Sequence, residues 1–351
     1  MPQAHSILAN IWYLVAGLIL FIYVALDGFD LGTGILSLTL PARLRPMLLT
    51  GLNGLRDGAE AWLLLLAAAL VGAFPSVSDW LWHQARLPML LLLGGLAVRA
   101  VALRNARRGD LLWQALFGVG SLVAGACQGL LAGVLMQGVP DAAATAGSPV
   151  WLTPFCLLVA VGVVAGYVMM AAAYFGTLAA PELLPRGLAS GRAGALVALT
   201  VATACLAWAT RLHATAADHW ITPPLDYVLI AAAAAGAAAL LLYLIELRRG
   251  RARSAFLWSL AAFGALLGVA GASVYPYLVP DARTVQAAAA PNDLLVVLLT
   301  AAGILMPVLL VYNGINHPLF RRFDAPTRPR QPAAAARPFQ EGHLHRPRKT
   351  G

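Results

Sequence analysis

The sequence predicts an all-α polytopic membrane protein with nine transmembrane helices. Of its 351 residues, 60% are hydrophobic and only 11% are charged, a balance typical of chains that cross a bilayer several times. Long apolar runs alternate with short linkers rich in Pro and Gly, and basic residues concentrate in every second linker. A soluble domain this apolar would expose large hydrophobic patches.

Nine apolar runs approach or exceed the ~20 residues that a helix needs to span a bilayer. The first run is unusually long, so we expect its far end to tilt or to project beyond the hydrocarbon. It lacks the basic region and cleavage site of a secretory signal, which indicates a retained helix. The runs cover residues 7–38, 57–75, 86–103, 111–136, 152–177, 193–212, 225–247, 255–276 and 293–315.

The basic residues predict the orientation of these helices. Of the 24 Lys and Arg residues, 20 fall in the linkers after runs one, three, five and seven or in the segment after run nine. The opposite linkers hold Arg86, Arg211 and Arg283. Because cytoplasmic loops carry the excess of Lys and Arg, we expect the N-terminus outside and the C-terminus in the cytoplasm. Residues 321–351, rich in Pro, Ala and Arg without periodicity, are predicted to form a disordered basic cytoplasmic tail.

Composition also argues against several classes of function. The net charge of +9 does not indicate nucleic-acid binding, because the basic residues sit between apolar runs and in the tail rather than on an aromatic-interleaved face. Three cysteines lie in apolar runs without CxxC spacing, so we expect neither a zinc site nor a disulfide framework. All seven histidines fall in loops, run ends or the tail. Since membrane haem is usually ligated by a histidine within a helix, we expect no haem ligand and no metal site in this chain.

Two carboxylates lie inside the first apolar run, where lipid contact would exclude them. Asp27 and Asp30 are three residues apart and therefore share one helix face. Each costs about 3 kcal/mol at the centre of a membrane helix, which the apolar residues of the run nearly offset. The run can therefore enter a membrane, and its acids mark a functional site by default.

A second acidic pair and an arginine follow on the next two runs. Asp57 and Glu60 are again three residues apart, and Arg99 lies in the third run. The predicted orientation places all five charged residues near the cytoplasmic ends of three consecutive helices, which are usually neighbours. Buried carboxylates with one cation are the material of a proton relay. The sequence therefore predicts a proton path through these five residues.

Each of these residues also has a structural interpretation. Asp57 and Glu60 also suit an interfacial helix start, where acids favour the N-terminal dipole. Arg99 also has the length to extend to the cytoplasmic surface. Asp27 and Asp30 also suit a purely structural ion pair.

Residues 26–34 form the unusual string Leu-Asp-Gly-Phe-Asp-Leu-Gly-Thr-Gly, with Trp12-Tyr13 and Gly17 before it. This stretch resembles the first helix of subunit II of the cytochrome bd-type quinol oxidases. The likeness extends over about residues 7–320 and nine helices. Further matches are Asp-Gly-Ala-Glu-Ala-Trp at 57–62, Ala-Phe-Pro at 73–75, Met-Gln-Gly-Val-Pro at 136–140, Tyr-Pro-Tyr-Leu-Val-Pro at 275–280, and Arg99, Gly133, Pro307 and Tyr312.

The resemblance implies two four-helix bundles plus one peripheral helix. Helices one to four would then lie in residues 1–136, helices five to eight in 137–276 and the ninth in 277–320. It also implies a bacterial inner-membrane complex in which a haem-bearing subunit I holds haem b, haem d and the quinol site. That complex oxidises quinol and reduces oxygen to water. A haem-free subunit II stabilises subunit I and contributes acids to the proton path, among which Asp57 corresponds to a family residue.

Three departures from the family pattern accompany the likeness. Arg56 stands where the family has Trp, Ala59 where it has Asn, and Asp281-Ala282 where it has Ser-Ser. Two alternatives therefore stay open: a proton-coupled transporter that uses the same acids, and a diverged paralogue that acts as an assembly scaffold. The sequence also leaves open whether the complex holds a structural quinone and whether it has a small single-helix third subunit. We expect the chain to contact membrane lipid and not nucleic acid.

Overall fold

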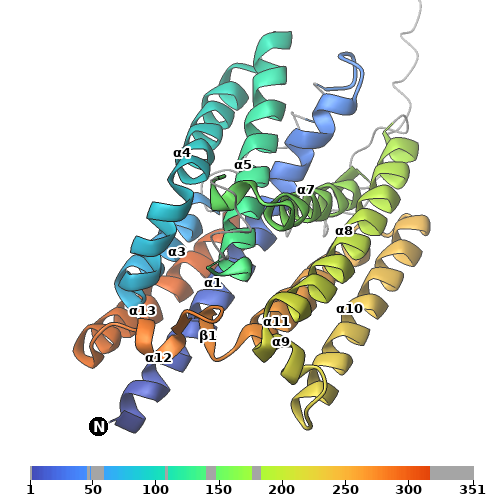
Figure 1. Ribbon diagram of the computed structural model, residues 1–351. Coiled ribbons are helices and arrows are strands. Elements are labelled where there is room, and N and C mark those ends of the chain that lie inside the picture. Colours follow the sequence, from blue (N-terminus) through green and yellow to red (C-terminus); the bar gives the residue numbers. More distant parts are fainter. Residues whose placement is uncertain are drawn as a thin grey trace, which may run out of the picture.

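A computed structural model describes residues 2–45, 48, 59–106, 110–139, 148–175 and 183–316. Figure 1 shows long helices that run between two ends of the molecule, with α1 passing through the assembly. The long helices are α1 (Pro2–Thr39), α3 (Ala59–Ala73), α4 (Pro75–Ala106), α5 (Leu111–Gln137), α7 (Pro154–Phe175), α8 (Leu184–Leu212), α10 (Leu225–Arg248), α11 (Ala252–Val274) and α13 (Asn292–Asn316).

The short elements gather where the N-terminus of α1 lies, at the lower end in Figure 1. The connections from α4 to α5 and from α10 to α11 lie at the opposite end. The connections between the long helices therefore lie at two opposite ends of the molecule, as expected when helices cross a membrane. The short elements are η1 (Val150–Leu152), α9 (Ala214–His219), β1 (Tyr277–Val279), β2 (Arg283–Thr284) and α12 (Val285–Ala288).

Every predicted apolar run overlaps one of the long helices. Among the described residues, eight helices are long and apolar enough to cross a membrane. The apolar part of α3, Glu60–Ala73, is shorter than a usual span. The structure thus agrees with a multi-pass helical membrane protein, whereas the count of nine spans and the division into bundles at residues 136 and 276 stay predictions.

The boundaries of α4 differ from those expected. The helix begins at Pro75, so the segment before residue 86, which was expected to be a linker, is helical. Within it, Ala85 leaves helical geometry with φ −135° and ψ 28°. The cause is Pro88, which cannot donate a hydrogen bond to the preceding turn and whose ring crowds it. The helix therefore kinks there instead of ending.

Glycines let α1 lie directly on two other helices. A Cβ on Gly32 would stand 1.9 Å from the backbone oxygen of Tyr167 on α7. A Cβ on Gly34 would stand 2.1 Å from the hydroxyl oxygen of Ser121 on α5. No other residue fits at such separations, and small residues are the usual means of close packing between membrane helices. The region of α1 that carries the two acids is therefore enclosed by α5 and α7.

A contact between His213 and Asp281 holds elements together at the end of the molecule away from the two acids. Asp281, in the turn between β1 and β2, has φ 56° and places its carboxylate 2.7 Å from Nδ1 of His213. The other ring nitrogen, Nε2, lies 3.1 Å from the backbone oxygen of Met136 at the end of α5. His213 is only 5% exposed. This one side chain thus connects the α8–α9 junction to both the hairpin and α5.

Candidate functional site

The α1 helix places three polar side chains along one face. Asp27 and Asp30 are 4% and 5% exposed, and Tyr23, one turn earlier, is 2% exposed. The hydroxyl of Tyr23 donates a hydrogen bond of 2.9 Å to Oδ2 of Asp27. Residues four apart on a helix are neighbours, so this contact is set by the helix itself. The predicted shared face of the two acids is confirmed.

Arg99 reaches these acids from α4. One terminal nitrogen lies 3.0 Å from Oδ1 of Asp27, and the other forms an ion pair with Oδ2 of Asp30. Arg99 is 6% exposed, so it does not extend to the surface as one alternative supposed. The guanidinium instead spans both carboxylates, for which its fork of donors is suited.

Close packing between α4 and α5 fixes the backbone that carries this arginine. A Cβ on Gly120 of α5 would lie 2.8 Å from the carbonyl oxygen of Gly95 and 3.0 Å from the backbone nitrogen of Arg99. The two helices therefore approach each other at the level of Arg99. Its long side chain then covers the remaining distance to α1.

The charge balance of this group has a chemical consequence. Two buried carboxylates face one guanidinium, so with both acids ionised the group carries one excess negative charge. One bound proton makes the group neutral. An isolated charge in a low-dielectric interior is expensive. With both acids ionised, the guanidinium therefore compensates only one of the two carboxylate charges.

Further hydrogen bonds connect the acids, Arg99 and Tyr23 to side chains of α5 and α7. Gln128 of α5 donates through Nε2 to the hydroxyl of Tyr23. Tyr167 of α7 donates its hydroxyl to Oε1 of the same glutamine. Gln128 is half-buried and Tyr167 is 2% exposed. The polar core, defined here as Tyr23, Asp27, Asp30, Arg99, Gln128 and Tyr167, thus draws on four helices.

The sequence did not single out Tyr23, Gln128 or Tyr167. Tyr23 had a detectable signal, because it precedes Asp27 by four residues on one helix. Gln128 is the most polar residue of an otherwise apolar and Gly-rich part of its run, which is also unusual in lipid. Tyr167 had no comparable signal, since tyrosines are common in membrane helices.

Of the second acidic pair, the structure describes only Glu60. Asp57 falls outside the described residues, so its predicted place in the path is not tested. Glu60 lies in the first turn of α3 and is exposed. Among the described contacts it forms no ion pair with the polar core. Its position fits the interfacial helix start proposed as its structural interpretation.

The histidines that the structure describes are engaged with protein groups. His5 contacts Asn292 and the backbone of Gln286, and His83 contacts the backbone of Asp79. His213 and His219 lie near the same end of the molecule. Within the described part of the chain no three His, Cys, Asp or Glu side chains group as metal ligands do.

The sequence of this chain is similar to those of known ubiquinol oxidase subunits. Subunit 2 of the cytochrome bd-I ubiquinol oxidase of Escherichia coli K12 is 26% identical over 357 residues, covering 88% of this chain and 93% of that protein. The corresponding protein of Escherichia coli O157:H7 has the same identity and coverage. Both relatives are thus subunits of an oxidoreductase complex.

A solved structure shares the fold. A chain of the bd oxidase from Geobacillus thermodenitrificans superposes with a TM-score of 0.73 at 19% identity, covering 88% of this chain and 98% of that one. The family model described as cytochrome bd terminal oxidase subunit II matches residues 8–320. Because that match spans most of the sequence, the chain belongs to the cytochrome bd terminal oxidase subunit II family.

Proposed function

We propose that this chain is the haem-free subunit II of a bd-type quinol oxidase. In this role it stabilises a haem-bearing subunit I and supplies acids to the path by which cytoplasmic protons reach the site of oxygen reduction. The observation that carries the proposal is the buried ion pair of Arg99 with Asp27 and Asp30. Membership of the family supports the same role, since a subunit II implies a partner subunit.

Haem b and haem d, held by the partner, would supply electron transfer from quinol and the reduction of oxygen to water. The residues of this chain would hold and pass the protons. Asp27 and Asp30 are the carriers, because a carboxylate accepts and releases a proton at its oxygens. Arg99 keeps the pair from carrying two uncompensated charges, and Tyr23 orients Asp27 through its hydrogen bond.

Protons would enter at the start of the second predicted run. The sequence carries Asp57 and Glu60 there, and the structure shows Glu60 exposed in the first turn of α3. The assignment to the cytoplasm rests on the basic linkers of the sequence, because α4 and α10, which precede two of them, end opposite the N-terminus of α1. The N-terminus of the chain would then face outward from the bacterial inner membrane and the basic tail would lie inside. Acids at the entrance attract protons and cations from solution.

The test is oxygen consumption by the assembled complex. The Asp27→Asn and Asp57→Asn variants would be purified by a tag on this chain and compared at equal haem content. Loss of a proton-carrying group should lower quinol-driven turnover by about tenfold or more, with assembly retained. Asp226→Asn is the matched control, since Asp226 is a partly exposed acid in the first turn of α10 and belongs to no described contact of the polar core. Normal turnover in an assembled Asp27→Asn complex would refute a relay at that residue.

A second candidate role is that of a scaffold that binds the partner without relaying protons. The same buried ion pair favours it, because paired charges in a core also fix how helices pack. The two roles separate in the Asp27→Asn complex. A scaffold loses yield of the complex while each assembled complex keeps its turnover, whereas a relay loses turnover while the yield holds.

A further inference from the structure

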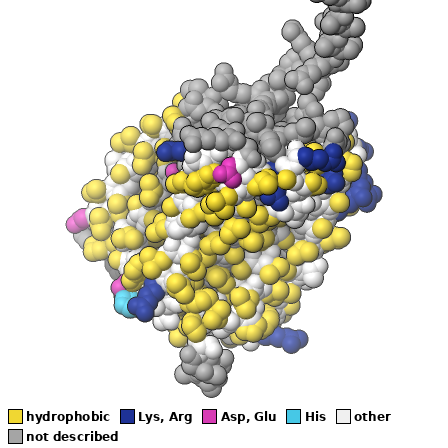
Figure 2. Space-filling model, turned by 90° about the horizontal axis from the view of Figure 1, so that it is seen from above, with side chains coloured by type: hydrophobic (Ala, Val, Ile, Leu, Met, Phe, Trp, Pro, Cys, Tyr) yellow, Lys and Arg dark blue, Asp and Glu magenta, His cyan; other side chains and the backbone are white. Residues whose placement is uncertain are grey.

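The turn between α10 and α11 carries an unusual density of positive charge. Four arginines fall within six residues, at positions 248, 249, 251 and 253, and all four are exposed. Gly250, between them, has φ 69° and lets the chain reverse tightly. Figure 2 shows Lys and Arg side chains gathered on the side of the molecule where α8, α10 and α11 lie in Figure 1.

A buried glutamate organises two of these arginines. Glu246 is 7% exposed. Its Oε1 lies 2.9 Å from Arg249, and its Oε2 lies 3.6 Å from Arg251. The two arginine side chains themselves stay 60% and 65% exposed. A guanidinium has five N–H donors, so each arginine keeps donors free of Glu246 while its position is fixed. The pair keeps an excess of positive charge, because one carboxylate faces two guanidinium groups.

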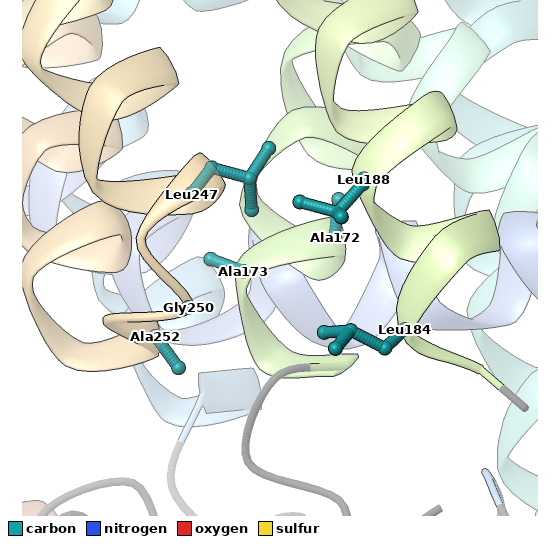
Figure 3. Close-up of a pocket in the computed structure, with 7 residues that line it drawn as sticks. All are labelled: Ala172, Ala173, Leu184, Leu188, Leu247, Gly250 and Ala252. Atoms are coloured by element: carbon teal, nitrogen blue, oxygen red, sulfur yellow. The ribbon is translucent and has the colours of Figure 1, made fainter. Parts of the chain in front are cut away.

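An apolar recess opens beside this turn. It is shallow and partly open to the outside, with room inside it for about one water molecule. Figure 3 shows the lining side chains of α7, α8 and the turn facing one another around it. Small residues form the opening, because alanines stand where larger side chains would close it. The described lining consists of Ala172, Ala173, Leu184, Leu188, Leu247, Gly250 and Ala252.

We propose that this place binds one anionic phospholipid, with the phosphate on Arg249 and Arg251 and the upper part of an acyl chain lying against the apolar residues that line the recess. The two halves of the site match the two halves of such a molecule. Gly250 lines the recess and separates the two arginines in sequence, so the cationic rim and the apolar slot adjoin. Arginine forks suit phosphate oxygens, and basic pockets between helices on the cytoplasmic side bind acidic head groups.

A soluble phosphate compound fits the site less well. It would use the arginines but would leave the apolar recess in contact with water. A neutral lipid would fill the recess but would leave the fixed guanidinium donors without an anion. Only an amphiphile with an anionic head group uses both features. The lipid would then bridge α7, α8 and the α10–α11 turn and hold their ends together.

The test is the lipid that stays bound to the intact complex. Complexes purified by a tag on this chain would be washed in mild detergent, and their phospholipids and quinones extracted and quantified by mass spectrometry. The Arg249→Gln/Arg251→Gln variant should retain about one anionic phospholipid fewer per complex than the parent, with zwitterionic lipid unchanged. Arg86→Gln/Arg211→Gln is the control, since both residues are exposed arginines on other helices, α4 and α8, and neither lines the recess.

Two further measurements distinguish the occupants. Leu188→Trp, which fills the recess but keeps both arginines, should lose the same lipid, whereas Arg249→Lys/Arg251→Lys, which keeps the charge, should retain part of it. Inorganic phosphate added during the wash should not displace the lipid. An unchanged content of anionic phospholipid in the glutamine variant, an equal loss in the control, or a loss confined to quinone would overturn the proposal.

Discussion

Replacing Arg99 with Met would remove the only cation of the polar core while keeping a side chain of similar length. Asp27 and Asp30 are 4% and 5% exposed, so water cannot take the place of the guanidinium. Breaking a buried ion pair on one side costs about 3–5 kcal/mol. At about 1.4 kcal/mol per factor of ten, the unfolded or dissociated fraction should rise by roughly a hundredfold to several thousandfold.

The assay is the fraction of intact complex that survives stepwise heating in detergent, followed by size-exclusion chromatography of a fluorescently tagged chain. Arg99→Met should lose the complex at a clearly lower temperature than the parent. The triple variant Arg99→Met/Asp27→Asn/Asp30→Asn should recover most of the loss, because neutral groups do not need a buried cation. Arg211→Met, at an exposed site, is the control. Parental stability of Arg99→Met, or no recovery in the triple variant, would refute the reasoning.

Two further predictions concern packing. Gly32→Ala should sharply reduce the yield of folded chain, because the added Cβ would stand 1.9 Å from a backbone oxygen of α7. Gly17→Ala is the control and should express normally, because no atom lies within 4 Å of its added Cβ. Equal yields of the two variants would contradict the close packing. His213→Ala should destabilise by about 1 kcal/mol, since it frees the backbone oxygen of Met136 and the partly exposed carboxylate of Asp281. Limited proteolysis of the hairpin should detect this loosening, and unchanged cleavage would argue against the contact.

The helices and the central ion pair could be predicted from the sequence for simple physical reasons. A helix that spans a bilayer needs a long apolar run, so each run in the sequence predicted a helix. A charge in such a run needs a partner, and Arg99 lies in one of the neighbouring runs. The structure brings Arg99 to both Asp27 and Asp30.

Other features depend on tertiary context that a local pattern does not contain. Pro88 ends a helix in most settings, yet here it only kinks α4 because the helix continues on its far side. Tyr167 joins the polar core only because α7 lies against α1, which no spacing along the chain indicates. Glu60 lies three residues from Asp57, but its exposure depends on where α3 begins.

The glycine contacts of α1 also limit how the protein can move. A helix turns by about 100° and advances 1.5 Å at each residue. Rotating α1 by one residue would bring Leu31 or Thr33 to the place of Gly32, where the backbone oxygen of Tyr167 leaves no room for any side chain. The helix therefore cannot work as a piston or a rotor at this level. A change of state in the acids would therefore involve side-chain rotation or water entry, with α1 held in register against α7.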